Sequence, residues 1–123
     1  MDRWPTFAAL NPPPVRDMPI LVGGGGEKVT LRITAQHADI WNGFGDPDVA
    51  AHKCRVLDEW CRKVGRDPSE IERSIGGMST NRLPQLDDYL EAGITHFIMG
   101  VGGPDWDLGL LPRLLAWRDA QNG

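Results

Sequence analysis

The alternation of apolar and polar positions predicts four strands, each followed by a helix. Short apolar runs that lead into glycine or turn residues indicate buried strands. Apolar residues that recur at steps of three and four indicate amphipathic helices. The strands are expected at residues 19–22, 38–42, 71–75 and 94–99. The helices are expected at residues 27–36, 47–64, 84–92 and 110–117.

The first two helices differ in how clearly the sequence marks them. In the first, Val29 and Ile33 are expected to mark one apolar face, and Leu31 and Ala35 extend it. The second has the longer apolar stripe and is expected to end at Gly65, because a left-handed residue commonly terminates a helix.

Strict alternation of strand and helix predicts an α/β fold with a parallel sheet and right-handed crossovers. Four consecutive βα units fit either a flavodoxin-like open sheet or half of a (β/α)₈ TIM barrel. We assign residues 19–123 to this half-barrel domain and residues 1–18, with four prolines, to an extended leader. Helices on one side leave the other sheet face to be covered by the leader, a second copy or further chain.

Length and charge exclude several classes of protein. The 123 residues are too few for a complete eight-unit barrel. The 13 basic and 17 acidic residues give a net charge of −4 without a basic stripe, so we expect no nucleic-acid partner. No apolar stretch approaches the length of a membrane span, and the amino end lacks the apolar core of a signal peptide. A cytoplasmic location is expected.

The strongest chemical signal is a run of glycines between the first strand and the first helix. Backbone N–H groups of Gly23, Gly24, Gly25 and Gly26, with no side chain in the way, are suited to bind an anion such as phosphate. The run matches neither the Walker nor the dinucleotide fingerprint, because Lys28 stands out of place for both. Anion binding and a tight turn without a ligand both remain open.

In a barrel, the loops that follow the strands form the functional rim. Lys28 and Arg82 lie in such loops and face either an anionic group or solvent. Trp41, at the end of the second strand, either stacks on a flat ligand or fills the core. Polar residues at strand beginnings are assigned to the opposite, stabilising rim and are not expected to be catalytic: His37, Asp39, Glu72, Arg73 and His96.

The sequence identifies neither a catalytic residue nor a metal site. It contains no serine–histidine–aspartate order, no HExxH and no CxxC. Cys54 and Cys61 lie two turns apart on a predicted helix, which is too far for a disulfide. We expect both to be small buried side chains.

Five segments together resemble the luciferase-like monooxygenase family, and within it the branch that uses the deazaflavin coenzyme. They are PILVGGGGEKVTLR (19–32), ADIWN (38–42), GRDPSEI (65–71), AGITHF (92–97) and LAWRD (115–119). The proline-rich leader also resembles the segment before the fifth strand of that family. The match follows the family's order through nearly the whole chain. It therefore implies the carboxyl-terminal half of a (β/α)₈ barrel.

The resemblance also implies a function. The chain would be an oxidoreductase, or half of one, that moves hydride between an organic substrate and coenzyme F-420 or FMN. Gly23 and Gly24 would approach the cofactor through their backbone, Gly25 and Gly26 would help to hold its polar tail, and Asn42 would line the rim. Arg82 is a further candidate for the tail.

The family's first four βα units, which carry most substrate contacts, have no counterpart in this chain. We expect the uncovered sheet face to be apolar. An exposed apolar face predicts a homodimer in which a second copy covers it. The alternative function is a non-catalytic remnant that acts as an anion-binding or dimerisation module. Whether the sequence is a piece of a longer protein stays open.

Overall fold

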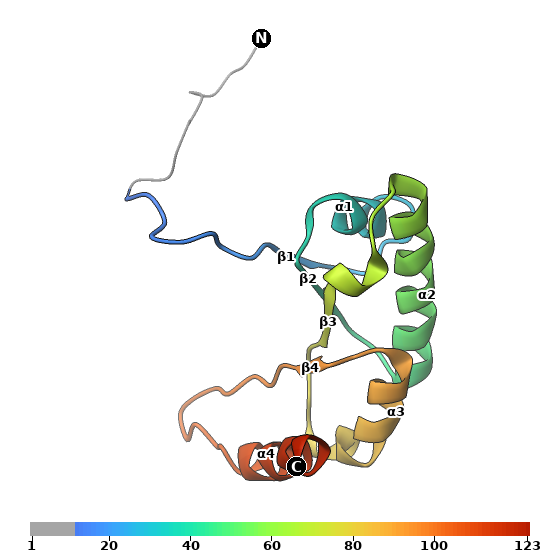
Figure 1. Ribbon diagram of the computed structural model, residues 1–123. Coiled ribbons are helices and arrows are strands. Elements are labelled where there is room, and N and C mark those ends of the chain that lie inside the picture. The colour runs from blue at the N-terminus through green and yellow to red at the C-terminus, as the bar shows by residue number, and fades with distance from the viewer. Residues whose placement is uncertain (1–11) are drawn as a thin grey trace.

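The computed structural model describes residues 12–123 and contains one parallel sheet. Its strands lie side by side in chain order, and each neighbouring pair is parallel (Figure 1). They are β1 (Leu21–Gly23), β2 (Ile40–Gly43), β3 (Glu72–Ile75) and β4 (His96–Phe97). The predicted α/β class with four parallel strands is confirmed.

A helix follows each strand, as the apolar periodicity predicts. The helices are α1 (Thr30–His37), α2 (Pro47–Val64), α3 (Leu86–Ala92) and α4 (Leu110–Asn122), with short 3₁₀ turns η1 (Pro68–Glu70) and η2 (Thr80–Gln85). Gly65 ends α2 with φ 77°, and Gly93 ends α3 with φ 106°. Both glycines adopt the left-handed conformation that side-chain-bearing residues avoid.

The four strands, the first helix and the third helix are each shorter than predicted, and the first helix and the fourth strand show how the ends differ. The first helix begins at Thr30 instead of residue 27, because the preceding residues form a wide turn that the Leu31 N–H closes on the Gly26 carbonyl at 2.8 Å. The fourth strand has two residues instead of six. Its flanks still contact β3, since the Thr95 N–H donates to Arg73 O and the Ile98 N–H donates to Ile75 O.

The core lies between the sheet and its helices. Figure 1 shows α1, α2 and α3 in an arc on one side of the strands. The side chains that fill this space are buried completely and come from both layers: Leu31, Trp41, Leu57, Ile75, Tyr89 and Ile94. Burial of this apolar surface is the main favourable term in the stability of the domain.

The apolar face of α1 differs from the prediction. Leu31, Thr34 and Ala35 are buried, whereas Val29 is 54% and Ile33 39% exposed. At 100° per residue, Val29 and Ile33 point away from Leu31 on the helix circumference, so the two apolar pairs cannot face the same neighbour. The helix packs through Leu31 and Ala35 against α2 and the sheet and leaves the other pair in solvent.

The opposite face of the sheet carries none of the helices α1, α2 and α3, although Ser74 on this face is buried completely. Residues 12–20 are exposed and, in Figure 1, run away from the domain as the blue segment. The expectation of an apolar face is wrong for its middle row. Side chains alternate across a strand, and the register places Asn42, Ser74 and His96 side by side on this face.

Candidate functional site

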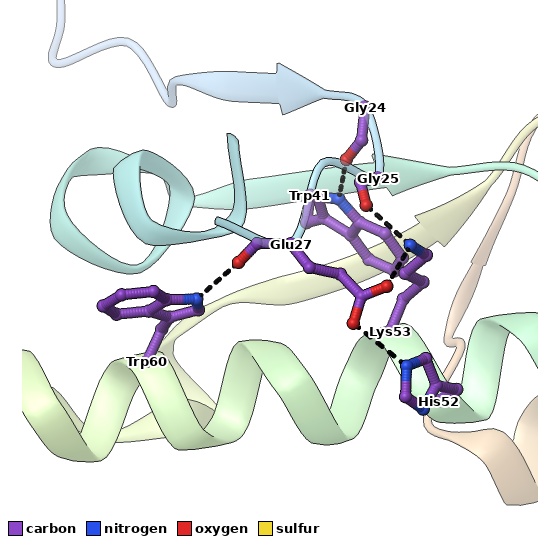
Figure 2. A network of polar contacts seen from close by, with 7 residues as sticks. All are labelled: Gly24, Gly25, Glu27, Trp41, His52, Lys53 and Trp60. Atoms are coloured by element: carbon purple, nitrogen blue, oxygen red, sulfur yellow. Dashed lines mark hydrogen bonds and ion pairs between the residues drawn. The ribbon is translucent and has the colours of Figure 1, made fainter. Parts of the chain in front are cut away.

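The glycine loop joins the carboxyl end of β1 to α1 and is held from beneath by two side chains. The Nε1 of Trp41 donates to the Gly24 carbonyl at 2.7 Å. The Nζ of Lys53, on α2, donates to the Gly25 carbonyl at 2.8 Å (Figure 2). Both donors come from later elements, so the loop is fixed by tertiary contacts.

The next two carbonyls are also bound within the protein. Gly26 O accepts the Leu31 N–H at 2.8 Å, and Glu27 O accepts the Trp60 Nε1–H at 2.7 Å. Trp60 lies on α2, like Lys53, and Figure 2 shows its indole reaching the loop from that helix. The carbonyls of residues 24–27 therefore all have a donor.

Most amide groups of the loop, in contrast to its carbonyls, have no hydrogen-bond partner in the described residues. The Gly24 N–H donates to Asn42 O at 3.0 Å, but the N–H groups of residues 25–28 find no acceptor within residues 12–123. Gly26, Glu27 and Lys28 are exposed. Carbonyls that are bound by the protein, beside consecutive amides open to solvent, make a local positive potential that favours an anion.

A cluster of charged side chains fixes the middle of the loop. Glu27 Oε2 lies 2.9 Å from Lys53 Nζ, and Glu27 Oε1 lies 3.0 Å from His52 Nε2 (Figure 2). Hydrogen bonds from Lys53, and secondarily from His52, lower the pKa of Glu27 below its ordinary value. The Lys53 charge is thus engaged by Glu27. Lys28 is exposed and has no ion-pair partner among residues 12–123, so it remains available to an anion.

The loop requires glycine at two of its positions. Gly24 has φ 122°, which other residues rarely adopt. A Cβ on Gly26 would lie 2.8 Å from Thr30 Oγ1, so the loop or Thr30 would have to move. A Cβ on Gly25 would make an ordinary contact at 3.4 Å with Lys53 Cε.

The sheet register brings the predicted rim residue Asn42 next to the glycine loop. Gly23, Asn42, Ser74 and His96 form one row across the sheet face opposite α1, α2 and α3. The Ser74 hydroxyl lies 3.0 Å from Asn42 Oδ1 and 2.8 Å from the Trp41 carbonyl oxygen. As predicted, His96 stands at the beginning of a strand, because β4 starts there. It pairs with Ser74 in the row of Asn42, and its Nδ1 lies 3.4 Å from Oε1 of Glu72, which also begins a strand.

Arg82 lies in η2, on the rim formed by the carboxyl ends of the strands. Its Nη1 donates to Gly45 O at 2.7 Å and to the Tyr89 hydroxyl at 2.6 Å, and that hydroxyl donates to Gly45 O at 2.7 Å. Burial raises the pKa of Tyr89. These contacts brace the loop between β2 and α2. No hydrogen bond joins Arg82 to the glycine loop within residues 12–123, and its contact with a cofactor tail stays a prediction.

Trp41 does not present a face to a ligand. It is buried completely on the helix side of the sheet, and the backbone of Gly43 passes directly over its six-membered ring. Of the two uses considered for this residue, the core indole is confirmed. Its functional contribution is indirect, because it orients the Gly24 carbonyl.

No family model matches this sequence, and no curated protein sequence matches it. Among solved structures, the chain is similar to an F420-dependent secondary alcohol dehydrogenase in complex with an F420-acetone adduct, a protein of luciferase-like fold. The sequences are 15% identical, and the TM-score is 0.63. The fold is a partial (β/α)₈ barrel. The match covers 80% of this chain and 47% of the dehydrogenase, so this chain spans about half of that structure's length.

In this partial barrel the glycine loop lies at the carboxyl end of β1, and Asn42 lies near the carboxyl end of β2. The carboxyl ends of the strands form the functional end of complete (β/α)₈ barrels. A depression of about 590 Å³ lies instead near the amino end of β3, where Asp58, Glu72 and Arg73 line it. Arg73 is bound there by Asp58 at 2.5 Å. This confirms the structural assignment of Arg73 and sets that depression apart from the glycine loop.

Other sequence predictions have plain outcomes. Cys54 and Cys61 are free and buried, and burial raises the pKa of both thiols. Within residues 12–123, no cluster of three or more histidine, cysteine or acidic side chains is placed to hold a metal. No helix in that part of the chain combines the length and apolar character needed to cross a bilayer.

The donors Lys53 and Trp60 are the contributors that sequence reasoning missed. Both lie on α2, far along the chain from the loop they bind, and Trp60 also packs partly against the core. The only sequence signal was an ammonium and an indole seven residues, or about two helical turns, apart on α2.

Proposed function

We propose that this chain forms the cofactor-binding half of an oxidoreductase that moves hydride between an organic substrate and a deazaflavin or flavin. One observation carries the proposal. In the loop after β1, donors within the protein hold the carbonyl groups, whereas the N–H groups of residues 25–28 stay open at the end of the barrel that is functional in complete barrels. The fold shared with an F420-dependent dehydrogenase supports coenzyme F-420 as the first candidate and FMN as the second.

The residues present fit the polar tail of such a cofactor. Both coenzymes carry phosphate, which suits consecutive backbone amides beside the exposed ammonium group of Lys28. Asn42 would contribute an amide group next to the loop, in the row that the register fixes. The cofactor supplies the hydride chemistry, and the protein supplies binding, orientation and polar contacts.

A fluorescence titration with coenzyme F-420 and with FMN tests this proposal. We expect saturable binding of at least one coenzyme with a dissociation constant in the micromolar range. Gly26→Ala should weaken it at least about tenfold, because the added Cβ meets Thr30 and displaces the amides. Gly100→Ala is the matched control, since its Cβ meets nothing within 4 Å.

Each result of the titration has a defined meaning. Loss of affinity in Gly26→Ala alone, with unchanged circular dichroism, supports the loop as the binding site. The absence of saturable binding for both coenzymes refutes the proposal. Binding of inorganic phosphate without either coenzyme would favour the alternative, a non-catalytic anion-binding module.

A further inference from the structure

The outer strands β1 and β4 form two open edges of the sheet, and these edges differ in shape. In a βα barrel each helix covers its own strand and the strand that follows. The described chain has no strand after α4, and this helix accordingly has no fully buried residue. Leu111 is 36% and Leu115 37% exposed. Part of α4 therefore extends beyond β4 with Leu111 and Leu115 exposed, while Leu110, Leu114 and Trp117 pack against the core.

This overhang forms a groove of about 370 Å³ between α4 and the free edge of β4. Most of its lining is apolar, and the polar part comes from Glu72, Thr95, His96 and Arg118. Its apolar walls come from both elements: Phe97, Met99, Leu111, Leu114, Leu115 and Trp117. The groove lies where the next strand of a complete barrel would lie.

The edge at β1 has the complementary form. Ile20, on the helix-facing side, is 53% exposed because no described helix precedes β1 to cover it, and Leu21, on the opposite side, is 48% exposed. Ile20 O accepts the Ile40 N–H, and Gly24 N–H donates to Asn42 O, so alternate residues bond to β2. The backbone groups of the residues between them point to the open edge. This edge is an apolar ridge with free strand hydrogen-bonding groups.

We propose that a second copy of this chain closes the barrel, with β1 of each copy lying beside β4 of the other and beneath its α4. Four strands from each copy give the eight strands of the complete fold. Ile20 and Val22 share the helix-facing side of β1, which is the side that enters the groove. A two-fold axis makes both contacts at once, so neither edge remains open.

Charge at the two edges favours a second copy as the occupant. Lys28 and Arg32, beside the ridge, are exposed and have no ion-pair partner within residues 12–123. Asp105 and Asp107, in the loop between β4 and α4, are exposed and likewise form no ion pair there. When β1 of one copy lies beside β4 of the other, these opposite charges meet at the same rim.

Sedimentation velocity of the full chain at micromolar concentration, without cofactor, tests the proposal. We expect a dimer. Ile20→Glu and Leu115→Glu should each raise its dissociation constant at least about tenfold, because either change buries an unpaired charge in the contact. Both side chains are exposed in the single chain, so the variants should fold. Val15→Glu is the control, since Val15 is fully exposed on the leader.

Chemical cross-linking distinguishes edge pairing from packing of sheet against sheet. The two native cysteines are buried, so a chain that carries both Ile20→Cys and Leu115→Cys offers two accessible thiols. A short bismaleimide should link two chains covalently. A monomer in sedimentation, a dimer unchanged by both glutamate variants, dissociation by Val15→Glu, or no covalent dimer would each overturn the proposal. Because no cofactor is present, failure here is independent of coenzyme binding.

Discussion

The two tryptophans that bind the glycine loop should differ sharply in their contribution to stability. Trp41 and Trp60 each donate through Nε1 to a loop carbonyl at 2.7 Å. Replacement by Phe removes that hydrogen bond in both cases, at about 0.5–1.5 kcal/mol. Trp41 is buried completely, so the smaller ring also leaves a cavity worth about 1–3 kcal/mol. Trp60 is half-buried, so water can fill the space that the smaller phenylalanine ring leaves.

The expected loss in the free energy of unfolding is therefore about 1.5–4.5 kcal/mol for Trp41→Phe and about 0.5–1.5 kcal/mol for Trp60→Phe. Urea denaturation followed by far-ultraviolet circular dichroism measures both without depending on the indole signal. A domain of this size has only about 5–15 kcal/mol to lose, so the difference is readily resolved. Equal losses, or a loss below about 1 kcal/mol for Trp41→Phe, would contradict the assignment of this indole to the core.

Three further outcomes follow from the same contacts. Cys54 and Cys61 should react with a thiol reagent only after denaturant is added, because burial raises the pKa of both; rapid reaction of the native protein would argue against their burial. Hydrogen bonds from Lys53 and His52 lower the pKa of Glu27, so this anchor is present at neutral pH and is lost as pH falls through the lowered pKa. The urea midpoint should therefore fall more steeply over that pH range in the wild-type protein than in Glu27→Gln, and an equal pH dependence of the two would refute this role. Tyr89→Phe should cost about 1 kcal/mol in urea denaturation, since it removes one bond to the β2–α2 loop, and an unchanged midpoint would refute that role.

The sequence was sufficient to predict the order and type of the elements because glycine marks their ends. Gly65 and Gly93 adopt positive φ where the helices were expected to stop. Each strand was found by a short apolar run, and alternation with helices requires parallel pairing. Helix-ending glycines and short apolar runs act on neighbouring residues only, so the sequence reveals them without the tertiary structure.

What the sequence could not predict depends on register and packing direction. His96 belongs to the row of Asn42 because β4 pairs with β3 at Ser74, and only the sheet sets that alignment. Val29 and Ile33 have the same apolar character as the buried pair on α1, so composition alone cannot say which pair meets α2. A shift of one residue in β4 would turn its side chains to the other face of the sheet. In α1 the two apolar pairs point about 200° apart, so the rotation of the helix decides which pair is buried.

The glycine loop shows why a motif needs its tertiary context. A glycine run can turn its carbonyls or its amides to solvent, and the two choices attract ligands of opposite charge. Here Trp41, Lys53 and Trp60 supply three donors that draw carbonyls inward, which leaves the amides outward. The anion preference of the loop is therefore determined by side chains that lie outside it. A glycine run of the same sequence without those donors would have no fixed preference, which is why the missing third glycine and the displaced lysine of the known fingerprints do not decide the matter.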